Sequence, residues 1–107
     1  MGKIRVRDLA KFAPDKMAKV ARASTARVQL DLYCVVPGQS QKAHTHADLD
    51  KIYYVLEGEG RFSLGGATEV LGPDEMLVAR AGVEHGLDNV GSTRLLVLVV
   101  VAPPPTH

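Results

Sequence analysis

Closely spaced turn signals divide the whole sequence and limit how long any regular element can be. Glycine and proline mark them at Pro37-Gly38, Gly65-Gly66, Gly72-Pro73 and Ala81-Gly82, and turns recur roughly every eight to twelve residues. Several segments between them alternate apolar with polar residues, which is the period of a half-buried β-strand. The pattern predicts eight to ten short strands, and therefore an all-β sandwich or barrel.

The expected strands cover residues 17–23, 27–36, 52–56, 60–64, 67–71, 75–80, 85–89 and 94–101. Alternation is clearest in RVQLDLYCVV, residues 27–36, where Leu30 and Leu32 flank the polar Asp31. This predicts a strand with one face in water. LLVLVVVA, residues 95–102, is apolar throughout. It is far shorter than the roughly 20 residues of a membrane-spanning helix, so we expect a fully buried strand.

The N-terminal segment differs from the rest in pattern and in charge. Apolar residues at Val6, Leu9 and Ala10 have helical spacing, and Pro14 stops the pattern, so one helix of at most about two turns is expected. Residues 1–27 carry eight basic and two acidic residues, a net charge of +6, whereas the remainder carries five basic and ten acidic residues, a net charge of −5. We interpret the basic segment as packing on its own acidic body or on a partner subunit. The sequence contains no recognisable nucleic-acid-binding module, so no nucleic-acid partner is predicted.

Composition indicates one globular domain. The 107 residues are 46% hydrophobic and 23% charged, which is ordinary for a folded chain of this size. The single cysteine, Cys34, cannot form an intrachain disulfide and lies in an apolar run, so we expect a buried, unreactive thiol. The basic, amphipathic N-terminus has no apolar leader region. We therefore expect a cytoplasmic protein without a membrane partner.

Three histidines form the candidate site. His44 and His46 are two residues apart, so on a strand both imidazoles would point to one face. His85 follows the turn at Gly82 and could supply a third ligand from a strand lying opposite. Imidazole is a ligand for zinc, iron, copper and nickel, and a metal site needs three or four such groups to converge.

Two motifs around these histidines resemble those of the cupin superfamily. In the first, Gly38, five residues and His44-Thr45-His46 are followed by the run YYVLEG, which ends at Gly58. In the second, Gly82, His85 and Asn89 have the expected spacing, with Arg80 where proline is usual. The resemblance covers about residues 28–101. It extends to a group of small single-domain bacterial cupins through the KMAK segment, the PGQSQKAHTH turn and the DKIYY run.

The resemblance implies a jelly-roll barrel, or double-stranded β-helix, with a divalent metal such as Fe, Mn, Zn or Ni in its mouth. The expected domain plan is an N-terminal arm at residues 1–27, the barrel at residues 28–102 and a proline-rich tail at residues 103–107. His107 lies in this tail and is assigned no role. A homodimer is also implied, and the apolar run at residues 95–101, together with Tyr54 and Leu56, is expected to contribute to its contact.

The resemblance also implies His44, His46 and His85 as metal ligands, but the fourth cupin ligand, a glutamate, has no counterpart here. Depending on the gap, its position falls on Asp50 or on Lys51. Because neighbouring strand residues face opposite sides, only one of the two can point inward. If Lys51 does, its ammonium opposes a metal cation, and either the lysine loses its proton or the metal binds weakly. If a bulge turns Asp50 inward, a three-histidine, one-carboxylate site results, and a third option is three histidines with water.

The remaining residues of this stretch have simpler interpretations. Tyr53 shares the face of Lys51 and is expected to line the pocket, whereas Tyr54 faces the other way. Asn89 is interpreted as a turn residue, and Gly58, Gly66 and Gly82 are expected to have positive φ.

Three functions are consistent with this site. The first is a metal-dependent enzyme, such as a dioxygenase or an isomerase, acting on a small molecule. The second is a non-catalytic, small-molecule-binding cupin, with or without metal. The third is metal-free acid–base catalysis, for which no orienting acid is apparent. The sequence assigns no catalytic residue.

Overall fold

The computed structural model describes residues 2–105, apart from the side chain of Arg22. Within this part of the chain there are nine β-strands and one 3₁₀ turn, η1, at Val6–Leu9. The strands are β1 (Ala18–Ser24), β2 (Gln29–Val35), β3 (Ser40–His44), β4 (Asp50–Glu57), β5 (Gly60–Leu64), β6 (Ala67–Leu71), β7 (Met76–Ala79), β8 (His85–Asp88) and β9 (Leu95–Ala102). The predicted all-β architecture is confirmed.

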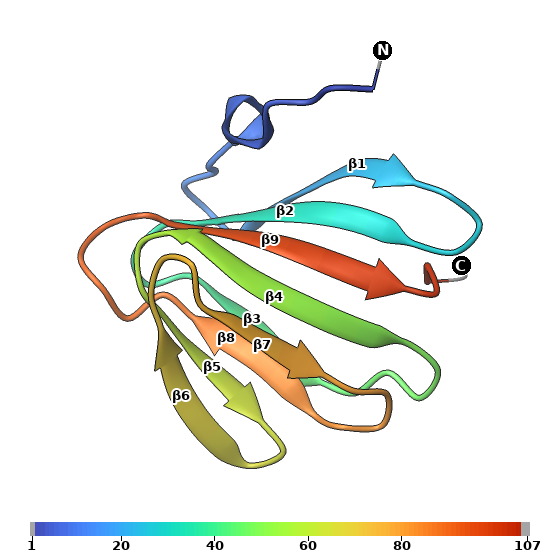
Figure 1. Ribbon diagram of the computed structural model, residues 1–107. Helices are drawn as coiled ribbons and strands as arrows, with labels where there is room; N and C mark the ends of the chain where they lie inside the picture. Colours follow the sequence, from blue (N-terminus) through green and yellow to red (C-terminus); the bar gives the residue numbers. More distant parts are fainter. Residues whose placement is uncertain (1, 106–107) are drawn as a thin grey trace.

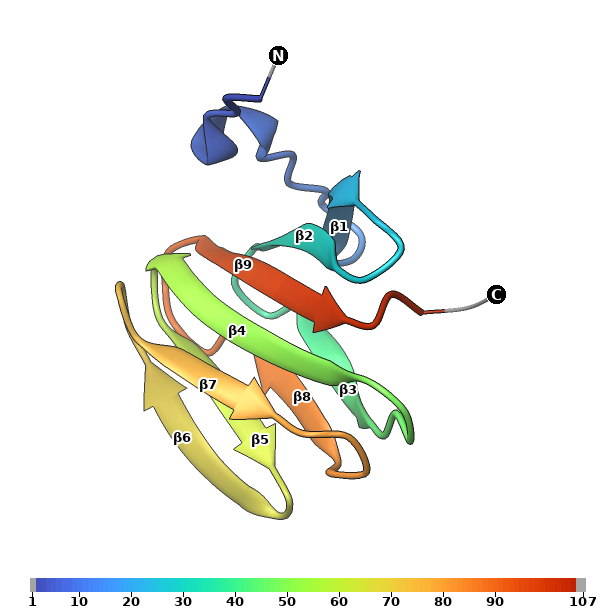
Figure 2. The same cartoon turned by 45° about the vertical axis from the view of Figure 1, so that its right-hand side comes forward.

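Two antiparallel sheets pack face to face and form the barrel (Figures 1 and 2). The larger has the strand order β1-β2-β9-β4-β7, and the smaller has the order β3-β8-β5-β6. The two sheets exchange strands along the sequence, so neither half of the chain forms a sheet by itself. This is the double-stranded β-helix predicted from the sequence motifs.

The core lies between the two sheets and is made from alternate residues of each strand. On β9, Leu95, Val97, Val99 and Val101 point inward and are at most 1% exposed. Phe62 and Leu87 face them from the smaller sheet. Each such side chain contributes about 1.5–3 kcal/mol when it leaves water, so this layer fixes which face of every strand points inward. The prediction that residues 95–102 are buried on both faces is only partly right, because Leu98 and Val100 are half-buried on the outer face.

The prediction of a wet face on β2 is wrong. Asp31 belongs to the inward row with Tyr33 and Val35, and all three are at most 3% exposed. The opposite row, which includes Leu32 and Cys34, is covered by the N-terminal segment. The sequence pattern of β2 alone could not show this, because the cover comes from residues distant in sequence. The buried cysteine is as expected.

The N-terminal segment is not the two-turn helix that was predicted. It forms a single 3₁₀ turn of four residues without a side-chain cap, and Ala10 is already extended. Val6, Leu9 and Phe12 pack on the outer face of the larger sheet, so the apolar spacing is explained by this packing. The guanidinium of Arg7 pairs with Glu57 at 3.1 Å, which places part of the basic arm on the acidic body. No helix among residues 2–105 is long and apolar enough to cross a membrane.

The turns carry the glycines that the sequence marked. Gly65 and Gly66, which join β5 to β6, have φ of 59° and 90°, as a tight two-residue hairpin turn requires. Gly58 and Gly82 also have positive φ, as predicted. At the β8 end, the buried Asn89 organises its turn by donating from Nδ2 to the carbonyls of Val35 and Thr93, both at 2.9 Å.

Candidate metal centre

The three predicted histidines converge at one end of the barrel. His44 is the last residue of β3, His85 is the first residue of β8, and His46 lies two residues beyond β3. One potential ligand atom from each histidine lies within 4.8 Å of the others. His44 and His85 are directly paired across the antiparallel strands β3 and β8. The third ligand, His85, therefore comes from the neighbouring strand of the same sheet and not from a strand lying opposite. His46 does not share the strand of His44 but belongs to the loop that follows it.

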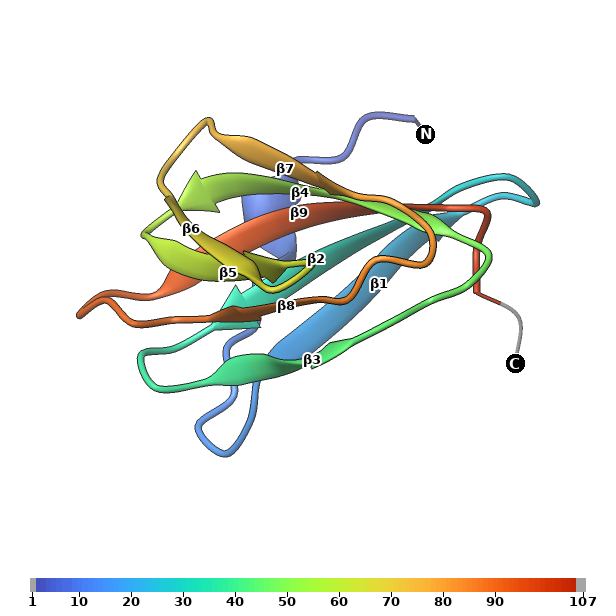
Figure 3. The same ribbon diagram turned by 90° about the horizontal axis from the view of Figure 1, so that it is seen from below.

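Two hydrogen bonds fasten together the loops that carry the cluster. The amide of Gly82 donates to the carbonyl of His46 at 2.7 Å, and the amide of Ala81 donates to the carboxylate Oδ1 of Asp50 at 2.8 Å. The β3–β4 and β7–β8 loops, together with the end of β9, gather on the right in Figures 1 and 3. Asp50 thus fixes the turn before His85 and lies outside the histidine cluster.

A close approach of two strands brings the histidines into reach. A Cβ at Gly86 would lie 2.8 Å from the carbonyl oxygen of Gln41 and 2.9 Å from the Cα of Ala43. The β3–β8 register is irregular between Gln41 and His44. Glycine next to His85 therefore permits β3 to lie against β8 at the point where the two imidazoles meet.

Backbone carbonyls set the tautomers of two histidines. Nδ1 of His44 is 2.9 Å from the carbonyl of Lys42, and Nδ1 of His85 is 2.9 Å from the carbonyl of Val83. Because a carbonyl can only accept, Nδ1 carries the proton in both neutral rings, and Nε2 has the free lone pair. Such second contacts are typical of metal-ligating histidines.

The surroundings of His46 and His85 favour the neutral form of these two imidazoles. Burial lowers the pKa of His85, and the hydrogen bond to Val83 only partly opposes this. Burial also lowers the pKa of His46, with smaller contributions from the positive charges of Lys51 and the neighbouring histidines. Nε2 of His85 is buried and has no hydrogen-bond partner among the described residues. An orphaned lone pair of this kind is costly unless a ligand uses it.

The donor set therefore fits a divalent metal. Imidazole nitrogens bind zinc at about 2.0–2.1 Å, which places the nitrogens about 3 Å apart around one ion. The present spread, up to 4.8 Å, requires a contraction of roughly 1–2 Å, which side-chain rotation can supply. Three imidazole nitrogens are a donor set that zinc, iron or nickel accepts.

Lys51 occupies the inward position that the motif reserves for glutamate. Its side chain is only 4% exposed, and its ammonium lies 3.4 Å from Nε2 of His44 and 3.3 Å from the hydroxyl oxygen of Tyr33. Burial lowers the pKa of Lys51 from 10.5 to about 8; the positive charge of Lys19 adds to this, and Asp31 opposes it. Of the two arrangements considered for this position, the structure has the lysine inward.

A chain of hydroxyl and amide groups continues from Lys51 into the barrel. Tyr33 accepts hydrogen bonds from Lys51 and from Nε2 of Gln41, at 3.3 and 3.1 Å. Tyr53 donates to Oε1 of Gln41 at 3.0 Å. Burial raises the pKa of Tyr33 to about 12 and also raises that of Tyr53, so both phenols stay neutral at physiological pH.

A cavity of about 360 Å³ borders the cluster at His46 and Lys51. Its lining consists of Lys19, Ala21, Gln29, Asp31, His46, Leu49, Lys51, Val101 and Pro105. Sequence reasoning missed Tyr33, Gln41 and Asp31 as neighbours of the site. Tyr33 and Asp31 could have been found from their shared row on β2 once the inward face of that strand was known.

The two-sheet barrel with its histidine cluster defines a small protein of the double-stranded β-helix class. The chain belongs to the cupin family, because the cupin domain matches residues 31–101, which is most of the sequence.

Solved structures agree with this assignment. TT1209 from Thermus thermophilus is 41% identical, with a TM-score of 0.94 over 98% of this chain and 100% of that one. An RmlC-like cupin from Desulfovibrio desulfuricans is 26% identical, with a TM-score of 0.87 over 98% of this chain and 99% of that one.

A curated relative is similar over a shorter region. The oxalate-binding protein of Thermotoga maritima is 34% identical over 65 residues, which is 61% of this chain and 54% of the relative. The chain thus matches only about half the length of that protein.

Proposed function

We propose that this cupin binds a divalent metal ion through His44, His46 and His85 and presents it to a small molecule in the adjoining cavity. The observation that carries the proposal is the convergence of three imidazoles on one point, together with the buried, unpartnered Nε2 of His85. A bound metal would supply a Lewis acid with open positions for water or a ligand. We propose the three-histidine set without Asp50, whose carboxylate is engaged by Ala81.

The residues around the cluster would act by positioning. The carbonyls of Lys42 and Val83 hold two imidazoles with Nε2 toward the centre. Asp50 and the Gly82–His46 hydrogen bond keep the two ligand-bearing loops together. The Tyr33–Gln41–Tyr53 chain places neutral polar groups next to Lys51.

A small anion is the first ligand to test. The Thermotoga maritima relative is named for oxalate binding, and a cavity of about 360 Å³ has room for a molecule of that size. Binding without turnover and metal-dependent catalysis, as a dioxygenase or an isomerase, are both consistent with this site.

One observation favours a metal-free binding cupin as the second candidate. The Lys51 ammonium can donate to Nε2 of His44 at 3.4 Å, which satisfies one of the lone pairs a metal would use. In this version the pocket holds its ligand through hydrogen bonds alone.

Metal analysis decides between the two candidates. Protein purified without chelator, or dialysed against Zn²⁺, Mn²⁺, Fe²⁺ or Ni²⁺ in turn, should contain close to one ion per chain and melt at a higher temperature. His85→Ala should abolish both effects. Zero metal uptake by the wild-type protein, with a melting temperature insensitive to every ion, would establish the metal-free candidate.

We also propose that the chain forms a homodimer through the outer face of the larger sheet. Two cross-strand rows on this face contain no charged residue: Val78, Ile52, Val100 and Leu30, and then Met76, Tyr54 and Leu98. Met76 and Val78 are 55% and 41% exposed. A continuous apolar face of this kind is unusual for a monomer.

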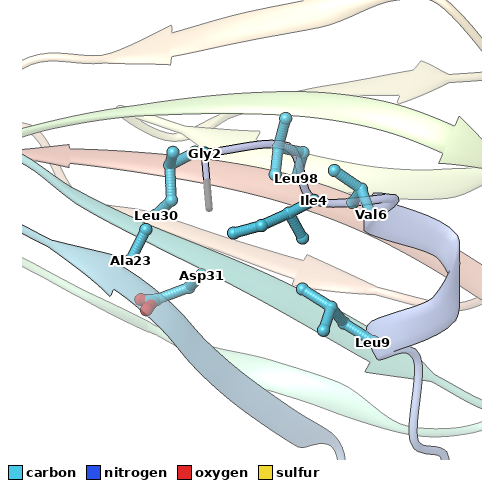
Figure 4. A pocket seen from close by; sticks show the side chains of 8 residues that line it. All are labelled: Gly2, Ile4, Val6, Leu9, Ala23, Leu30, Asp31 and Leu98. Atoms are coloured by element: carbon cyan, nitrogen blue, oxygen red, sulfur yellow. The ribbon is translucent and has the colours of Figure 1, made fainter.

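The N-terminal segment extends this surface. Ile4 and Val6 lie over Leu30 and Leu98 and enclose a largely apolar cavity of about 330 Å³ (Figure 4). Ile4 remains 51% exposed, and a second copy could cover it.

Light scattering tests the dimer. Val78→Glu should shift the mass from two chains to one, whereas Val70→Glu, at an exposed position on the edge strand β6, should not. A wild-type monomer would refute this proposal. A cytoplasmic location stays a prediction that cell fractionation would test.

A further inference from the structure

Lys51 is a buried cation without an anionic partner. Its two hydrogen-bonding neighbours, the phenol of Tyr33 and the imidazole of His44, carry no negative charge, and no carboxylate among residues 2–105 forms an ion pair with it. Buried charges in proteins are normally paired. Asp31, which lines the same cavity, accepts a hydrogen bond from Gln29 at 2.9 Å and does not neutralise the lysine by direct contact. The described residues therefore give Lys51 no negative charge in direct contact.

Metal binding would increase the excess of positive charge around Lys51. The lone pair on Nε2 of His44 can be given to the Lys51 ammonium or to a metal, but not to both. When a metal takes it, Lys51 keeps only Tyr33 as a partner and faces a dication a few ångströms away. Like charges at such a distance in a poorly solvated pocket repel strongly. The glutamate at this position in the family motif would reduce the positive charge of the centre by one, whereas Lys51 increases it by one.

A second cation, Lys19, lines the same cavity. The ammonium groups of Lys19 and Lys51 lie 5.3 and 5.9 Å from the centre of the Tyr33 ring. Lys19 and Lys51 both line the cavity, against the single acid Asp31. With a metal present, the pocket would carry a clear excess of positive charge, which favours an anion over a neutral molecule of similar shape.

We propose that Lys51 is the specificity-determining residue of this site and binds a carboxylate group of a small anion beside the metal. The inference rests on the proposed metal-binding function. Lys51 takes no part as a metal ligand; its ammonium turns from His44 to the carboxylate when the ion is bound. The ligand class is a compact carboxylate, with dicarboxylates of the size of oxalate or malonate preferred because their charge of −2 best offsets the pocket.

Calorimetric titration of Co²⁺ and then of oxalate tests this assignment. Lys51→Met keeps the length of the side chain and removes its charge, and Lys16→Met, at an exposed position, is the matched control. The variant should bind Co²⁺ at least as tightly as the wild type, because the competitor for His44 is gone. Its affinity for oxalate should fall about 10- to 100-fold, the effect expected for losing one charge-assisted hydrogen bond. Oxamide, the neutral analogue, should bind both proteins equally weakly.

The outcomes separate the two proposals. If the wild type takes up no Co²⁺, the metal-binding function fails. If it takes up Co²⁺ and Lys51→Met binds oxalate as tightly as the wild type, only the role of Lys51 is overturned. Loss of Co²⁺ binding in a Lys51→Met protein whose circular dichroism and melting are unchanged would likewise overturn it, because Lys51 would then be a ligand.

Discussion

Replacing Lys51 by methionine should stabilise the metal-free protein, and the gain should disappear as the pH rises. Burial lowers the pKa of Lys51 from 10.5 to about 8, so the folded state holds this proton less tightly than the unfolded state. This lowering of the pKa corresponds to roughly 3 kcal/mol of destabilisation below pH 8. Methionine fills a similar volume without the charge. Leaving Tyr33 and His44 without their donor costs about 1 kcal/mol, so a net gain of about 2 kcal/mol is expected at pH 7.

The sign of the pH dependence follows from the same shift. Between pH 8 and 10.5 the unfolded chain keeps the Lys51 proton and the folded chain has released it, so the stability of the wild type rises with pH in this window. The variant lacks this rise. The stability difference should therefore shrink by about 1.4 kcal/mol per pH unit above pH 8 and be close to zero near pH 9.5.

Urea unfolding of chelator-treated protein at pH 7.0, 8.0, 8.8 and 9.5 measures this difference. Ionisation of the tyrosines and of Cys34 affects both proteins alike and cancels in the comparison. Lys16→Met should show no pH-dependent difference from the wild type. A Lys51→Met protein that is less stable than the wild type, or more stable by an amount that does not change with pH, would refute the reasoning.

Three further outcomes are expected. Gly86→Ala should lower the free energy of unfolding by about 1–3 kcal/mol and reduce Zn²⁺ affinity at least tenfold, because the added methyl meets the β3 backbone; unchanged Zn²⁺ affinity would contradict the close-approach argument. Asp50→Asn should leave the Zn²⁺ content by elemental analysis unchanged, since that carboxylate binds Ala81. Cys34, buried and with its pKa raised by burial, should react with a thiol reagent only at the rate of unfolding, and rapid labelling of the native protein would show otherwise.

Much of the fold could be predicted because turn chemistry and strand alternation are local properties. β5 and β6 begin and end at the predicted residues since Gly65-Gly66 fixes their hairpin. Errors arose where distant segments decide the outcome. The helical spacing at Val6 and Leu9 predicts a longer helix than the one that forms, because these side chains pack on Leu32, Cys34 and Leu96, which lie at least 23 residues further along the chain.

For the candidate site, too, the sequence predicts which residues take part but not how distant strands arrange them. The three histidines could be identified from motif spacing, and the structure brings them together. Their arrangement could not be identified, because the pairing of His44 with His85 depends on sheet register. The choice between Asp50 and Lys51 also required the register of β4 against β9, which places Lys51 beside Val101 in the inward row.

The position of β3 at the edge of its sheet connects metal binding to the local stability of this strand. β3 is an edge strand of the smaller sheet and is bonded only to β8 within it, with an irregular register before His44. Edge strands of this kind open locally at low free-energy cost. An ion bound by both His44 and His85 would cross-link β3 and β8, which are far apart in the sequence. Metal binding would therefore slow amide hydrogen exchange along β3, including at residues that do not contact the ion.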